Sequence, residues 1–157
     1  GEMTTAHECS EENFDRIMRI NLRGVWLCMK YEIQQMLQQG GGAIVNMASN
    51  AGMQGTALLP AYAASKAGVV SLTQTAAVEV AAKGIRINCI NPGLIRTPMV
   101  AKQLETNPKQ VEEFIQMHPI GRIGTPEDIA EAVVWLCSDA ASFVVGHPMN
   151  VDGGYLA

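Results

Sequence analysis

Helical and extended segments alternate along this chain, and that alternation restricts the possible folds more than any other feature of the sequence. Residues 11–38 and 61–83 repeat apolar side chains with the period of an α-helix. Each is followed by a short segment that we interpret as a buried strand, at 43–49 and at 85–91; the first is a nearly continuous apolar run, as is typical of strands covered on both faces. Parallel strands joined by crossover helices suit this order, because each crossover covers one sheet face. The sequence therefore predicts an α/β fold with a parallel sheet.

Residues that start and stop helices support these boundaries. Ser10 is a candidate N-cap for the first helix, and Gly84 directly follows the second. Thr125 and Pro126 form a strong start for a third helix, because proline suits the first helical position. A short strand is expected in the final stretch "HPMNVDGGYLA".

Residues 94–124 carry no sustained pattern and separate the second strand from the third helix. Connections of this length are usually functional, so we expect an irregular substrate flap here. No internal repeat or low-complexity linker divides residues 1–157, which are numerous enough for one domain with its own core. The opening residues read like the approach to a helix within a larger protein, so we expect a single-domain fragment that an N-terminal portion precedes.

Composition and charge exclude several classes of function. The net charge is −4 with no cluster of basic residues, which argues against nucleic acid or an anionic membrane as a partner. The four cysteines lack CxxC spacing, so we predict free thiols in a reducing compartment and no disulfide framework. His7, His118 and His147 have no ligand neighbours at metal spacing, so we predict no metal site and interpret them as surface or packing residues. No apolar run is long enough to span a membrane, and we expect a cytoplasmic protein.

The stretch "AYAASKAGVV" places Tyr62 and Lys66 one helical turn apart. Residues i and i+4 of a helix are neighbours on one face, so the phenol and the ammonium can approach one point. A lysine that extends past a core tyrosine is the structural alternative. Ser49 ends the preceding strand, at the edge where open α/β sheets bind ligands. These three side chains form a candidate catalytic group.

Further polar residues are expected near the same edge. Pro92 and Gly93 end the next strand, and Thr97 follows them. Asn21 lies inside the first helix, an unfavourable place unless its side chain or a loosened backbone carbonyl has a use. Each residue also has a purely structural interpretation: Ser49 can cap the turn after its strand, Thr97 can cap a helix, and Asn21 can mark a helix irregularity.

Six blocks of the sequence, in order, extend over almost the whole chain: "INLRGVWLCMK", "GGAIVNMASNAG", "AYAASKAGV", "GIRINCINPGLIRTPM", "GRIGTPEDIAEAVVWLCSDAASFVVG" and "VDGG". In these blocks the chain resembles the classical short-chain dehydrogenase/reductase family. The resemblance implies the C-terminal part of a Rossmann-like, doubly wound parallel sheet with helices on both faces. The chain contains no GxGxxG turn, so the glycine-rich cofactor half of the family is expected outside it.

The resemblance also assigns roles to single residues. It implies a catalytic set of Asn21, Ser49, Tyr62 and Lys66. It implies that NAD or NADP, between which the sequence does not decide, contacts Tyr62, Lys66, Pro92, Gly93, Ile95 and Thr97.

The chemistry of carbonyl reduction suits these residue types. A proton donor must stand at the oxygen on which negative charge develops, and Tyr62 is the candidate. A free phenol has a pKa of about 10, and a nearby cation such as Lys66 favours its charged form. Ser49 would donate a second hydrogen bond to the substrate, and Asn21 would by resemblance anchor a water that links Lys66 to solvent.

The expected function is therefore an NAD(P)-dependent oxidoreductase that transfers a hydride between a nicotinamide cofactor and an alcohol or ketone. A 3-oxoacyl thioester, a sugar, a steroid and a diol all remain open as substrates. The alternative is an inactive oligomerisation or binding module that retains the scaffold. The resemblance further implies a homodimer or homotetramer through the helices 11–38 and 61–83, and strand 43–48 is expected to form an unpaired edge that invites association of the isolated chain.

Overall fold

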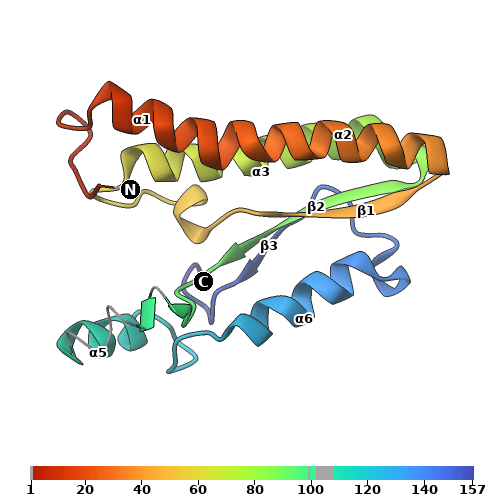
Figure 1. Cartoon of the computed structure of the whole chain (residues 1–157). Coiled ribbons are helices and arrows are strands. Elements are labelled where there is room, and N and C mark those ends of the chain that lie inside the picture. Colours follow the sequence, from red (N-terminus) through yellow and green to blue (C-terminus); the bar gives the residue numbers. More distant parts are fainter. Residues whose placement is uncertain (1, 99, 102–107) are drawn as a thin grey trace.

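Three parallel strands form the centre of the computed structural model, which describes residues 2–98, 100, 101 and 108–157 (Figure 1). Strands β1 (Gly42–Met47), β2 (Ile85–Pro92) and β3 (Pro148–Val151) are hydrogen-bonded in the order β1-β2-β3. Strand β1 pairs with β2 from Gly42 opposite Ile85 to Met47 opposite Ile90. Both strand predictions from the apolar runs are confirmed to within two residues.

The first predicted helix is one continuous helical run with an irregular centre. It consists of α1 (Glu11–Met18), a π-helical segment (Arg19–Arg23) and α2 (Gly24–Gln39). The Ser10 side chain accepts a hydrogen bond from the backbone N–H of Asn13, as expected of an N-cap. At the other end Gly40 adopts the left-handed conformation, with φ of 88°, which a glycine adopts without strain.

Helices cover both faces of the sheet (Figure 1). Helix α3 (Pro60–Val80), extended by a 3-10 turn (Ala81–Lys83), lies with α1 and α2 on one face. Helix α6 (Pro126–Cys137) covers the other, and its N-cap Thr125 and Asp128 exchange the reciprocal hydrogen bonds of a capping box. This layering confirms the predicted doubly wound arrangement.

Apolar side chains fill the space between these layers. On the side of α2 and α3, Ile85 and Ile87 of β2 are fully buried against Ala77. On the side of α6, Ile90 is buried against Leu136. Adjacent residues of β2, such as Cys89 and Ile90, therefore serve cores on opposite faces, as expected of a strand that is covered on both sides.

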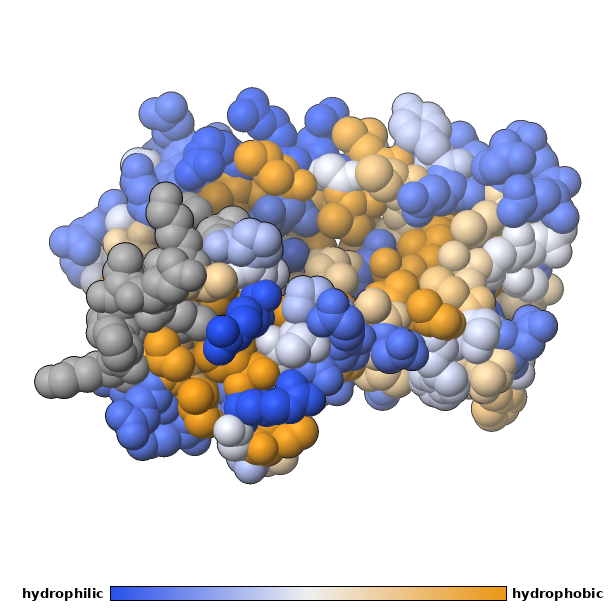
Figure 2. Space-filling model, turned by 60° about the horizontal axis from the view of Figure 1, so that its bottom comes forward, coloured by the Kyte–Doolittle hydropathy of each residue, from blue (hydrophilic) through white to orange (hydrophobic). Residues whose placement is uncertain are grey.

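The predicted flap at residues 94–124 is less irregular than its sequence suggests. A parallel bridge between Ile95 and Gly124 joins its two ends, and the flap contains helix α5 (Pro108–Gln116). The expectation of irregular structure is thus wrong for α5, whereas residues 99 and 102–107 lie outside the described residues. Figure 2 shows that hydrophobic residues lie exposed on the face that carries α5 and α6; Met117, Ile120 and Val134 are among the exposed ones.

Strand β1 has a neighbour on one side only within the described part of the chain, so its other edge is unpaired, as predicted. In the described residues, no helix is both long and apolar enough to cross a membrane.

Candidate active site

The carboxyl edge of the sheet brings the predicted catalytic residues toward the first turns of α3. After β1, the N–H of Ala48 still bonds to the carbonyl of Ile90, and Ser49 follows at the rim. The chain then forms a 3-10 turn, Asn50–Gly52, directly against α3. A Cβ at Gly52 would lie 2.7 Å from the backbone carbon of Lys66, so only glycine allows this approach. The turn that carries Ser49 therefore rests on the backbone of the helix that carries Tyr62 and Lys66.

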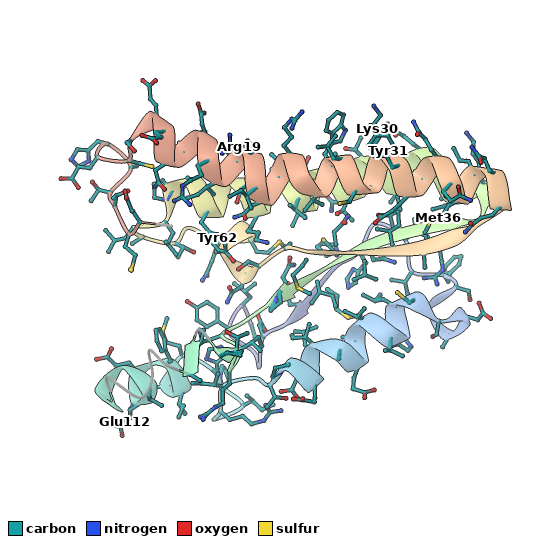
Figure 3. All side chains as sticks on the ribbon, in the orientation of Figure 1. Arg19, Lys30, Tyr31, Met36, Tyr62 and Glu112 are labelled. Atoms are coloured by element: carbon teal, nitrogen blue, oxygen red, sulfur yellow. The ribbon has the colours of Figure 1, made fainter. Side chains whose placement is uncertain are left out.

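Tyr62 and Lys66 lie on one face of α3, as their spacing predicts. The Lys66 Nζ atom is 5.8 Å from the centre of the Tyr62 ring, within the range of a cation–π contact. Both residues are half-buried. Figure 3 shows Tyr62 at the end of the molecule where α3 begins. Among the described residues, no hydrogen bond joins the Tyr62 hydroxyl to Lys66 or to Ser49.

The ammonium of Lys66 is held by the end of β1. Its Nζ donates a hydrogen bond of 2.9 Å to the backbone carbonyl of Met47. Burial lowers the pKa of Lys66, because partial removal of water disfavours the charged form. The same removal of water weakens screening, so the charge acts more strongly on its neighbours than it would on an open surface.

Asn21 reaches α3 from the π-helical segment. Its Nδ2 donates to the Ser65 hydroxyl at 3.3 Å, and that hydroxyl donates to the backbone carbonyl of Tyr62 at 2.7 Å. Ser65 is fully buried and was not predicted as a site residue. Asn21 thus has a use for its side chain, and it also stands in a helix irregularity, so both interpretations of its position hold.

Ser49 and Thr97 both make the capping contacts of their structural alternatives. The Ser49 oxygen accepts the N–H of Ala51 at 3.2 Å, and its hydroxyl donates to the Asn50 side chain at 3.3 Å. The exposed Thr97 hydroxyl accepts the N–H of Val100 at 3.4 Å. Neither contact prevents a catalytic or binding role, since the Ser49 donor can turn to another acceptor and the Thr97 hydroxyl keeps its proton.

Two cavities are lined by some of the predicted site residues, whereas Ser49, Lys66, Pro92 and Thr97 line neither of them. A cavity of about 600 Å³ lies beside the start of α3 and is lined by Asn21 and Tyr62 together with apolar side chains that include Ile17, Leu59 and Val100. A smaller cavity of about 260 Å³ is lined by Gly93, Ile95, His118 and the segment after β3.

Pro92 and Gly93 extend the pairing of β2 with β3, because Pro92 lies opposite Val151 and the Gly93 N–H bonds to the Val151 carbonyl. A Cβ at Gly93 would lie 2.8 Å from the Nε2 atom of His118 and 3.0 Å from the Cα of Asp152. The missing side chain of Gly93 therefore leaves room for the His118 ring and for the backbone of Asp152.

A family model described as "Enoyl-(Acyl carrier protein) reductase" matches residues 2–156, which include every residue of this site. The chain belongs to the short-chain dehydrogenase/reductase family. The structure of ElxO with NADP bound has a TM-score of 0.95 at 33% identity over 99% of this chain, and this chain covers 63% of it. This likeness confirms the predicted Rossmann-like fold.

Two curated members of the family are similar in sequence over almost all of this chain. The cyclohexanol dehydrogenase of Acinetobacter sp. (strain SE19) is 46% identical over 155 residues, which are 99% of this chain and 59% of the relative. The cis-4-hydroxycyclohexanecarboxylate dehydrogenase of Sinomonas cyclohexanicum is 47% identical over 152 residues, which are 96% of this chain and 59% of the relative. The chain therefore spans 59% of the length of these two curated relatives.

The donor set at the carboxyl edge suits one end of a nicotinamide cofactor. Lys66 offers a partly desolvated ammonium, Tyr62 offers a hydroxyl group on the same helix face, and Ser49 offers a second hydroxyl on the adjoining turn. Ammonium and hydroxyl donors are the groups that ribose hydroxyls and a carboxamide can engage. The residues of this chain therefore fit the nicotinamide end of such a cofactor, whereas the sequence has no glycine-rich turn for the phosphates.

Proposed function

We propose that this chain carries the catalytic and substrate-binding residues of an NAD(P)-dependent oxidoreductase that interconverts an alcohol and a ketone. The observation that carries the proposal is the Tyr62–Lys66 pair at the carboxyl edge, with the buried Ser49 on the adjoining turn. The two curated relatives, whose names describe dehydrogenases of hydroxylated cyclohexane rings, and the NADP-bound ElxO structure support the same class of reaction.

In this proposal the side chains act on the substrate oxygen. The Tyr62 hydroxyl donates a proton to that oxygen in ketone reduction and removes it in alcohol oxidation. The ammonium of Lys66 stabilises the phenolate that remains on Tyr62. The Ser49 hydroxyl donates a second hydrogen bond, turning away from Asn50 to do so. The nicotinamide, when bound, supplies or accepts the hydride.

Asn21 has two parts in the proposal. Through Ser65 it holds the backbone carbonyl of Tyr62, which positions the first turns of α3. As the family resemblance implies, it also anchors a water that links Lys66 to solvent. Tyr62 and Lys66, with the segment that carries Pro92, Gly93, Ile95 and Thr97, contact NAD or NADP.

A cyclic secondary alcohol or its ketone is the substrate that we propose. Beside polar residues that include Asn13 and Arg16, the cavity next to Tyr62 presents apolar side chains from α1, the π-helical segment and the loop before α3, among them Ile17, Ile20 and Leu59. Such a lining suits a hydrocarbon ring, and Tyr62 provides a polar group for its single oxygen. Residues 94–124 are proposed to complete this pocket as a substrate flap.

Replacement of the phenol tests the catalytic role of Tyr62. In the protein that carries this chain, Tyr62→Phe should lower turnover of cyclohexanol with NAD⁺ or NADP⁺ by about 10²- to 10⁴-fold, because the proton donor is lost. The affinity for the dinucleotide should stay within about threefold, since a phenyl ring preserves the packing. Tyr31→Phe is the matched control, because Tyr31 is 60% exposed on α2. Undiminished turnover in Tyr62→Phe would exclude the proposed role.

The same assay decides the alternative function. If the wild-type protein binds neither dinucleotide and turns over no alcohol or ketone, the oligomerisation or binding module is supported instead.

We further propose that the protein forms a homodimer or homotetramer through the long helices, with a second interface at the C-terminal strand. An open groove of about 1100 Å³ runs between the first helical run and α3. Apolar residues such as Leu22, Trp26 and Leu72 line it together with charged side chains of the first helical run, among them Asp15 and Arg19. Val78 of α3 is 78% exposed on the same pair of helices. Sedimentation velocity of the wild type and of Trp26→Glu tests this interface, since a charge there should shift the assembly toward monomer.

A further inference from the structure

His118 of the flap occupies an enclosed position between α5 and the segment that follows β2. It follows α5 by two residues, and only 3% of its surface is exposed. Its ring packs against that of Tyr155, with 5.3 Å between the ring centres. The position therefore differs from that of His147, which is exposed.

Both ring nitrogens of His118 have backbone partners. The Nδ1 atom lies 2.6 Å from the carbonyl oxygen of Phe114, and a carbonyl only accepts, so Nδ1 carries the hydrogen. The backbone N–H of Leu94 donates to Nε2 at 3.2 Å, so Nε2 carries a lone pair. One tautomer of the neutral imidazole, protonated at Nδ1, satisfies both contacts at once.

These two contacts join segments that are distant in the sequence. Phe114 belongs to α5 in the flap, whereas Leu94 lies in the loop after β2 between Gly93 and Ile95. The neighbouring Ile120 N–H bonds to the carbonyl of Gly153, so the segment after β3 is joined as well. The ring also fills the space that a side chain at residue 93 would need. The conformation of the loop 93–97 is thus tied to α5 through one side chain.

We propose that His118 is a positioning residue for the nicotinamide-binding loop 93–97. Its neutral, Nδ1-protonated ring holds the Leu94 amide and the flap in one arrangement, so that the segment is ordered before the cofactor arrives. The proposal rests on the proposed function, because it assumes that this loop contacts the nicotinamide end. A preordered loop binds more tightly, since less conformational entropy is lost on binding.

The tautomer can be measured without any cofactor. Long-range ¹H–¹⁵N correlation spectra of the wild-type protein that carries this chain, at neutral pH, should show His118 protonated at Nδ1 and not at Nε2, and the Leu94 amide should exchange slowly with solvent. A ring protonated at Nε2, or one that averages between both tautomers, overturns the proposal. This measurement does not depend on whether the protein is an enzyme.

Paired substitutions then separate the two contacts. His118→Gln places an acceptor near the Nε2 position and can keep the bond to Leu94, whereas His118→Asn places a donor near Nδ1 and keeps only the bond to Phe114. In the protein that carries this chain, His118→Ala and His118→Asn should bind NAD⁺ or NADP⁺ about tenfold more weakly, and His118→Gln should recover most of the affinity. His147→Gln serves as the matched control and should match the wild type.

The outcomes distinguish the two proposals. Equal dinucleotide affinity in the wild type and His118→Ala overturns the positioning role alone, as does a Gln variant that is no better than the Asn variant. If the wild type binds neither dinucleotide, the proposed function fails, and the positioning role fails with it even where the spectra show the Nδ1-protonated ring.

Discussion

Gly52 offers a sharp test of how the fold sets the geometry of the site. A Cβ at this position would lie 2.7 Å from the backbone carbon of Lys66 and 2.8 Å from the backbone nitrogen of Ala67. Ordinary contacts of a Cβ begin at 3.4 Å, so in Gly52→Ala the turn must retreat from α3 by about 0.7 Å. Helix backbone cannot yield as a flexible side chain would, and the strain falls on the turn that carries Ser49.

The expected magnitudes follow from this displacement. Overpacking of this kind costs about 2 kcal/mol, which lowers the melting temperature of a chain of this size by roughly 4–8 °C. Because Ser49 moves relative to Tyr62, we expect turnover to fall by about 10- to 100-fold. Differential scanning calorimetry and the alcohol dehydrogenase assay measure the two effects on the same preparation.

Gly55→Ala is the matched control, because it lies in the same loop and its added Cβ would meet nothing within 4 Å. Neither glycine has a positive φ, so alanine causes no backbone strain at either position. Both substitutions also restrict the unfolded chain to the same extent. The control should be neutral or slightly stabilising. Equal melting temperatures and equal turnover in the two variants would refute the argument that backbone contact at Gly52 positions the site.

Three further predictions concern reactivity, pH and association. Burial raises the pKa of the Cys89 thiol to about 11, so iodoacetamide at mildly alkaline pH should label the exposed Cys28 and Cys137 and reach Cys89 only after unfolding, as mass spectrometry can show. Because the folded state retains the Cys89 proton, the stability that this proton contributes is lost as the pH rises from 9.0 toward 11. Arg122 holds the pKa of Asp128 below its usual 3.8, so the Arg122–Asp128 pair stabilises the fold above that pH and loses this effect on acidification. The melting temperature of Asp128→Asn should therefore vary less than that of the wild type between about pH 5 and about pH 3. The unpaired edge of β1 predicts that the isolated 157-residue chain self-associates and that Ala43→Lys reduces the self-association. A compact monomer in sedimentation that melts cooperatively in calorimetry would contradict this prediction.

The order of the elements could be predicted because local signals agree with the tertiary structure. Ser10 and Thr125 cap the helices that their positions predict, and Gly84 ends the second helical run in the left-handed conformation. Helix α5 carries Val111, Phe114 and Ile115 at helical spacing, but this pattern is too short to stand out from its surroundings. Asn21 indicated a possible irregularity in the first helix, but the sequence does not specify that it takes the form of a π-helical segment over Arg19–Arg23.

Within the candidate site, contacts between residues close in the sequence could be predicted, whereas contacts between distant residues could not. Spacing alone predicts that Tyr62 and Lys66 share a face, since their partnership lies within one helical turn. Ser65 escaped prediction because its role depends on Asn21, which is 44 residues away in the sequence. His118 was interpreted as a surface or packing residue, since nothing in the sequence indicates that its ring meets the amide of Leu94, 24 residues away.

Close backbone approach links these separate observations into one account of the site. At Gly68 of α3, an added Cβ would lie 2.8 Å from the side chain of Leu22, next to Asn21 on the π-helical segment. Gly52 lets the Ser49 turn rest on α3, and Gly93 leaves space for His118. The side chains of Asn21, Ser49, Lys66 and His118 thus lie at or within three residues of a glycine contact that sets the distance to a neighbouring element. Short polar side chains such as Ser65 reach their partners only across such distances, so substitutions at these small residues should disturb the site although none of them takes part in the chemistry.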